Sequence, residues 1–178
     1  MNLPTLITLF ASLPLAPNVP VKTTRGSMVA IEKSIDSQIQ RINVEDPLFL
    51  IGPTRGMYVN GFGAVFSSEV NLVANAGISP FRPAYTKEEL AKLHEKKQQR
   101  AAQLKQHMRD MLVNAVWALE TLPPDDNVVL GVSILYFSWE DSSGLPRQIV
   151  MKAQRRVLLT APRSDTAAIE SAIHTEEY

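Results

Sequence analysis

The sequence predicts an α+β fold, in which a four-stranded, mainly antiparallel sheet of two hairpins packs against two helices, the second of them long. Three features predict it. Apolar residues recur at helical spacing over residues 28–42, and again over residues 90–122. Two other segments, residues 54–72 and 127–160, have the pattern of strand, turn and strand.

Composition is that of an ordinary globular domain. The chain has 178 residues, of which 45% are hydrophobic, so one core over residues 27–160 is expected. Eighteen basic residues balance eighteen acidic ones, which does not favour nucleic acid as a partner. The chain has no cysteine, and therefore neither disulfides nor thiolate chemistry.

The first element is an apolar run, LPTLITLFASLPLA, from Leu3 to Ala16. Its length suits the hydrophobic part of a signal peptide and is too short to span a membrane stably. No Lys or Arg precedes it, and a clean cleavage site is missing. Residues 1–16 are therefore predicted to be a signal peptide of an exported protein, periplasmic or secreted. The alternative is an apolar N-terminal arm of a cytoplasmic protein. Residues 17–26, with two prolines, are expected to form an extended linker.

The two helices follow in order, each with one buried face. The first is expected from Met28 to Ile42. The second begins with Thr86 and Glu89 at the spacing of a capping box and continues to Leu122. An unbroken helix of that length would measure roughly 54 Å, more than a domain diameter of about 40 Å. Its polar first half should therefore protrude from the body.

The first hairpin is expected to turn at Asn60-Gly61, because a two-residue type I′ turn favours this pair. Val59 would then face Phe62, and alternate side chains would sort onto two faces. The core face would carry Met57, Val59, Phe62, Ala64, Phe66, Val70 and Leu72. The polar face would carry Tyr58, Ser67, Glu69 and Asn71, with Arg55 on the opposite side from Glu69.

The second hairpin joins an apolar strand in residues 127–139 to a half-exposed strand in residues 147–159. Its glycine and serine, Gly131 and Ser133, could lie beside Gly63 and Ser67 and make a floor of small residues. A helix or the N-terminal arm could pack on this floor, or it could be a shallow groove for a ligand or peptide. Residues 161–178 are expected to be a tail or a short helix.

Motifs for familiar chemistry are incomplete. Gly61 is followed by Phe62, where a phosphate-binding loop needs lysine, and Phe66 stands where a dinucleotide fingerprint needs glycine. His94 opens a segment that resembles a zinc motif, but Gln98 replaces its second histidine. No metal or cofactor is therefore expected.

Two hypotheses of function remain. The leading one is a non-enzymatic module that binds a protein or small ligand through the long helix or the polar sheet face. Leu90 and Leu93 would anchor a partner or a homodimer through the helix, and Trp139 is a further contact candidate. The alternative is an enzyme that uses Glu69 in a cleft over the sheet, with Tyr58 and Asn71 nearby.

Overall fold

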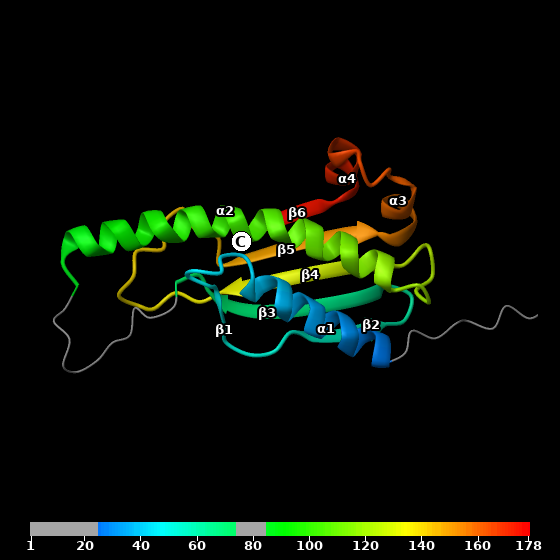
Figure 1. Cartoon of the computed structure of the whole chain (residues 1–178), viewed down its shortest axis with the longest axis horizontal. Coiled ribbons are helices and arrows are strands. Elements are labelled where there is room, and N and C mark those ends of the chain that lie inside the picture. Colours follow the sequence, from blue (N-terminus) through cyan, green and yellow to red (C-terminus); the bar gives the residue numbers. More distant parts are fainter. Residues whose placement is uncertain (1–24, 74–84) are drawn as a thin grey trace, which may run out of the picture.

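The computed structural model describes residues 25–73 and 85–178 (Figure 1). The helices are α1 (Arg25–Gln40), α2 (Lys87–Ala118), α3 (Arg155–Thr160) and α4 (Thr166–Ala172). The strands are β1 (Phe49–Leu50), β2 (Arg55–Val59), β3 (Gly63–Asn71), β4 (Asn127–Ile134), β5 (Gln148–Gln154) and β6 (His174–Glu177). The fold is thus α+β, as predicted.

The sheet is mixed and six-stranded, which corrects the expected antiparallel sheet of four strands. Its order is β1-β3-β4-β5-β6, and β2 pairs with β3 on the same edge as β1. The central pair, β3 and β4, is parallel. The reason is α2, which carries the chain back along the sheet so that β4 starts beside the start of β3, with Gly63 opposite Asn127.

Both long helices lie on one face of the sheet (Figure 1). The core is the layer between them. It joins isoleucines of α1, such as Ile35 and Ile39, to leucines of α2, such as Leu104 and Leu112, over Phe66 and Leu130 of the sheet. The short helices α3 and α4 belong to the same side, because α3 contacts α2 and α4 contacts α3.

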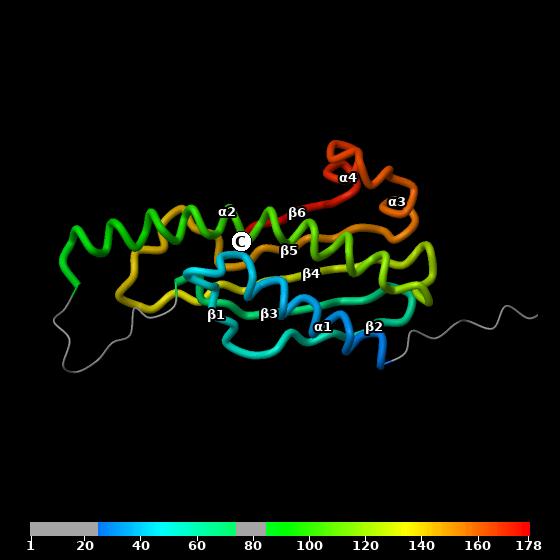
Figure 2. The backbone as a smooth tube through the Cα atoms, in the orientation of Figure 1, coloured from blue at the N-terminus to red at the C-terminus, as the bar shows by residue number. Residues whose placement is uncertain are grey.

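The helix α2 begins with the predicted capping box, in which the Thr86 side chain accepts from the amide of Glu89 and the Glu89 side chain accepts from the amide of Thr86. Its 32 residues measure roughly 48 Å. The nine residues of β3 measure only roughly 30 Å. The first turns of α2 therefore extend beyond the sheet, where the connection between β4 and β5 runs beside them (Figure 2).

The first hairpin has a different register from the predicted one. Val59 faces Gly63, and Tyr58 faces Ala64, so the loop contains three residues, 60–62, rather than two. The backbone of Gly63 has φ +134°, and a Cβ there would lie only 1.9 Å from the carbonyl oxygen of Asn127. The unusual backbone conformation of Gly63 thus accommodates the longer loop. The missing side chain lets the start of β3 lie close to β4.

That shift of one residue reverses the faces of β2. Met57 and Val59 point away from the helices, and Tyr58 points towards them. The predicted core positions on β3 are correct, since Ala64, Phe66, Val70 and Leu72 are all buried. Met57, Val59 and Phe62, by contrast, are exposed, which corrects the predicted core face.

The end of the chain adds an edge strand. Residues 161–178 form α4 and then β6, which pairs with β5. The predicted signal peptide, residues 1–16, and most of the predicted linker, residues 17–26, lie outside the described residues. Within residues 25–73 and 85–178, none of the helices combines the length and apolar character that crossing a bilayer requires.

Candidate functional site: the open face of the sheet

The face of the sheet that points away from α1 and α2 has no helix on it in the described part of the chain. We call it the open face. Burial alternates along β4 and β5, with every second residue buried under the helices and the residues between them partly exposed. The strand pairing places the outward side chains in rows that run across the sheet.

Three rows define the open face. The first row is Met57, Val65, Val129, Lys152 and His174. The second row is Arg55, Ser67, Gly131, Val150 and Glu176. The third row is Ile51, Glu69, Ser133, Gln148 and Tyr178, whose outer members join through backbone hydrogen bonds.

Large apolar side chains predominate at the β1–β2 edge of the open face, beside the charged Arg55. Met57 is 60% exposed and Phe49, at the far end of β1, is 59% exposed, while Ile51 and Val59 are more than two-fifths exposed. Phe49 pairs with Asn71 and therefore points to the same side. Large apolar side chains that gather on one uncovered surface are typical of a contact surface, whereas single ones are common anywhere.

The opposite edge is polar and charged. On β6 the Glu176 carboxylate accepts a hydrogen bond from the Tyr178 hydroxyl and lies 2.8 Å from Nε2 of His174. The bond from Tyr178, followed by that from His174, lowers the pKa of Glu176, and the nearby Lys152 acts in the same direction. The carboxylate of Glu176 is thus held ionised on the surface, opposite Arg55 at the other end of its row.

Gly131 occupies the middle of the open face, and nothing in the part of the chain that the structure describes requires a glycine there. Its φ is not positive. A Cβ at this position would meet only the Phe66 carbonyl oxygen at 3.9 Å and Cγ2 of Val150 at 4.0 Å, both ordinary contacts. A glycine inside a strand costs stability and often marks a place where another molecule or backbone approaches closely.

The structure separates the residues of the predicted polar face. Ser67 and Glu69 are exposed on the open face. Asn71 has the same orientation, but it is buried and its Oδ1 accepts from the amide of Val73 at 3.2 Å. Tyr58 lies on the helix side, where its hydroxyl donates to Asp126 at 2.9 Å, and this bond raises the pKa of Tyr58. Arg55 joins Ser67 and Glu69 on one face, contrary to the prediction.

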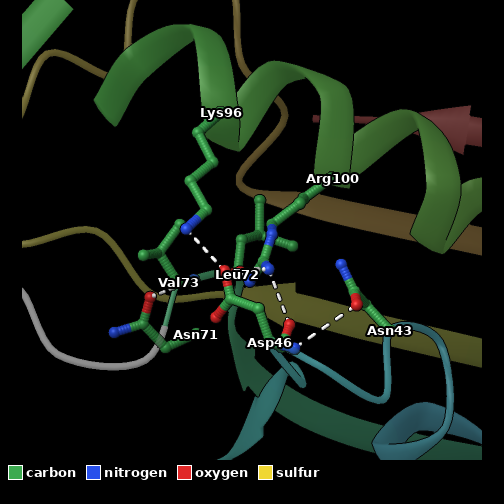
Figure 3. Close-up of polar contacts among 7 residues, drawn as sticks. All are labelled: Asn43, Asp46, Asn71, Leu72, Val73, Lys96 and Arg100. Atoms are coloured by element: carbon green, nitrogen blue, oxygen red, sulfur yellow. Dashed lines mark hydrogen bonds and ion pairs between the residues drawn. The ribbon is translucent and has the colours of Figure 1, made fainter. Parts of the chain in front are cut away.

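A cluster of charged groups fixes the end of β3 beside Asn71 (Figure 3). The guanidinium of Arg100, which is buried, donates to the carbonyl oxygens of Leu72 and Asp46, each at 2.6 Å. The carboxylate of Asp46 lies 2.5 Å from both Arg100 and Lys96. The hydrogen bond with Lys96 is the main reason that the pKa of Asp46 is lowered. This cluster ties α2 to the edge of the sheet.

The remaining predicted contact residues lie around the overhanging start of α2. Leu90 and Leu93 are half-buried. Trp139 stacks between Tyr85 and Phe137, with ring centroids 4.9 and 5.6 Å away. Contacts within the chain therefore already cover much of these apolar side chains.

The same region contains an ion pair that the sequence did not reveal. The side chains of Lys97 and Glu140 are 1% and 2% exposed, and they pair beneath the β4–β5 connection. The ammonium also lies 4.9 Å from the ring centre of Tyr136, whose pKa is raised to about 12 chiefly by burial. One carboxylate oxygen of Glu140 has no hydrogen-bond partner within the described residues.

A groove of about 630 Å³ lies on the helix side, between α1, α2 and α4. Its lining mixes both signs of charge, for example Arg41 and Asp110. Several lining groups already contact each other: Asn114 donates to Gln38 at 3.2 Å, and Arg109 lies 3.5 Å from Glu170. The groove therefore has no dominant charge for one class of ligand.

Sequence reasoning missed most of the open face. Met57 and Val59 were placed in the core because the turn was taken as two residues long, and β6 was not predicted as a strand. The alternation of His174, Glu176 and Tyr178 was a signal that could have found it, because polar residues at every second position are typical of an edge strand.

No family model, curated protein or solved structure matches the chain.

Proposed function

We propose that the protein is a non-enzymatic binding module and that the open face of the sheet is its contact surface. The observation that carries this proposal is the group of exposed apolar side chains at the β1–β2 edge, namely Phe49, Ile51, Met57 and Val59. They lie on a face without a helix in the described residues. A parallel strand pair such as β3–β4 is usually covered on both faces. A partner that covers the open face would complete that arrangement.

The alternative, an enzyme that uses Glu69, has less support. Glu69 is exposed on a strand. A carboxylate that exchanges protons near neutral pH usually needs burial or a neighbouring charge to raise its pKa. The open face is thus better suited to contact than to proton transfer.

The long helix is also a weaker candidate than the open face. Its predicted anchors, Leu90 and Leu93, are half-buried, and the β4–β5 connection braces the helix there through His94, whose Nδ1 lies 3.0 Å from the carbonyl oxygen of Asp141. Less apolar surface is therefore left for a partner.

Two matched substitutions test the proposal. Met57→Lys places a charge on the open face, and Val157→Lys places one on an exposed apolar residue of α3, on the helix side. Tagged wild type and both variants would be added to extract of cells that make the protein, and the sizes of the assemblies compared by native chromatography. We expect an assembly that Met57→Lys removes and Val157→Lys retains. Assemblies whose size is the same for Met57→Lys as for the wild type would contradict the proposal.

A further inference from the structure

We propose that the partner of the open face is the open face of a second copy of this chain, related by a two-fold axis that runs parallel to the strands over β4. This inference rests on the proposed function and names the partner of the same surface. Its support comes from three independent features: the charges, a glycine at the centre, and the area.

Rotation about the proposed axis leaves each row at the same position along the strands. It reverses the order of the strands across the sheet. Each β2 then lies over β6 of the other copy, each β3 over β5, and β4 over β4. Identical surfaces meet in such a dimer, so the face must complement itself. Two sheets that pack face to face keep their strands nearly aligned, which agrees with an axis along the strands.

The charges of the open face are complementary under this rotation. In the second row, Arg55 of one copy meets Glu176 of the other, and the pair occurs twice. In the first row Lys152 meets Val65, where its alkyl stem can pack. In the third row Glu69 meets the amide of Gln148. Among the described residues in the three rows, no side chain lies opposite a charge of its own sign.

In the same arrangement, side chains of the second copy cover the apolar side chains of the β1–β2 edge. Tyr178, which is 66% exposed, would lie over Ile51 at 41% exposed. Met57 would lie over the imidazole of His174. Glu176 can still accept from Arg55 after its contacts with Tyr178 and His174, because a carboxylate has about four acceptor sites.

Gly131 would lie against its own copy near the axis, with Ser133 beside it. Small residues at this point allow two backbones to approach closely. No contact among residues 25–73 and 85–178 explains the glycine, since a Cβ would meet no atom of these residues closer than 3.9 Å. A second copy supplies the missing reason for it.

The area is sufficient for a weak or moderate dimer. Five strands at about 4.8 Å spacing and eight residues at about 3.3 Å each give roughly 600 Å² for each copy. The two copies would bury roughly 1,200 Å², the lower end of the range for specific interfaces. Self-association should therefore depend on concentration.

Charge reversal in the full-length chain tests the inference by sedimentation velocity, from about 1 to about 200 μM. The variants are Arg55→Glu, Glu176→Arg and both together, with Lys33→Glu on the exposed side of α1 as control. We expect each single reversal to weaken the dimer about tenfold. The double variant should return to within about threefold of wild type, because the pair is restored with its signs exchanged.

Two outcomes would overturn the inference. One is a chain that stays monomeric throughout the range. The other is a dimer that both single reversals leave intact, or that the double variant fails to restore; loss of such a dimer by Leu93→Glu would assign it to the long helix. A monomer that still forms an assembly in extract, sensitive to Met57→Lys, would reject self-association and leave the proposed function standing.

Discussion

Gly131 offers the sharpest test, because one substitution should change stability and association in opposite directions. In Gly131→Thr the new Cβ would meet the Phe66 carbonyl oxygen at 3.9 Å and Val150 Cγ2 at 4.0 Å, which are ordinary contacts within the described residues. Glycine in a strand interior costs about 0.5–1 kcal/mol relative to alanine, and β-branched residues favour strands further. The free energy of unfolding of the monomer should therefore rise by about 1 kcal/mol.

The same side chain would obstruct the centre of the proposed dimer. Its methyl and hydroxyl point out of the open face, where the two copies would approach most closely. Overpacking of a close contact typically costs about 1–3 kcal/mol, so the dimer dissociation constant should rise at least about fivefold.

Urea unfolding at low micromolar concentration measures the first effect, and sedimentation equilibrium measures the second. Gly56→Ala is the matched control, because its Cβ would lie 2.8 Å from Cε1 of Phe66 and 3.0 Å from Cε of Met28. That variant should lose about 1–3 kcal/mol of unfolding free energy. If Gly131→Thr destabilises the monomer, or leaves association unchanged, the explanation given for this glycine fails.

Three further predictions concern the polar contacts of the fold. Glu140→Ala leaves the ammonium of Lys97 buried without its carboxylate, and it should lower the free energy of unfolding by about 3–5 kcal/mol in urea titrations; a loss below about 1 kcal/mol would mean that the ammonium reaches water. Asp46→Asn should be less stable than wild type at pH 7. Because the pKa of Asp46 in the folded state is below 3.8, this difference should shrink as the pH falls below 3.8, and a constant difference between pH 7 and pH 3 would contradict the assignment. Thr54→Val removes a buried hydroxyl that bonds Asp36 at 2.5 Å, and calorimetry should show a loss of about 1–3 kcal/mol, unlike an exposed change such as Ser164→Ala.

The elements with strong local signals could be predicted from the sequence. The start of α2 followed from the capping box of Thr86 and Glu89, and its overhang followed from its length. The buried side of β3 followed from the alternation of Phe66, Val70 and Leu72 with the polar Ser67, Glu69 and Asn71. These signals depend on residues close together in sequence, so the structures that they predict do not depend on how distant segments pack.

The features that were missed depend on distant residues. The parallel pairing of β3 with β4 is decided by how α2 packs across the sheet. The register of the first hairpin depends on Gly63, whose close approach to Asn127 involves a strand 64 residues away. The partner of Lys97 is 43 residues distant, at Glu140.

Most of the open face was missed for the same reason. Ser67 and Glu69 were placed on one exposed face, and Gly131 was expected beside Ser67, where it lies, whereas Gly63 lies beside Asn127. The shift of one residue in β2 then moved Met57 and Val59 from the expected core to this face. An apolar edge thus replaced what had been predicted as a polar surface.

Cross-linking near the proposed axis tests the central claim most directly, because the chain has no cysteine of its own. In Ser133→Cys the two thiols of a dimer would face each other beside the close approach at Gly131, within reach of a short bis-maleimide. Ser171→Cys, on the exposed surface of α4, is the matched control. We predict rapid formation of a covalent dimer for Ser133→Cys, lost in the Arg55→Glu background, and little for Ser171→Cys. Equal and slow cross-linking of both variants would contradict contact between the open faces of two copies.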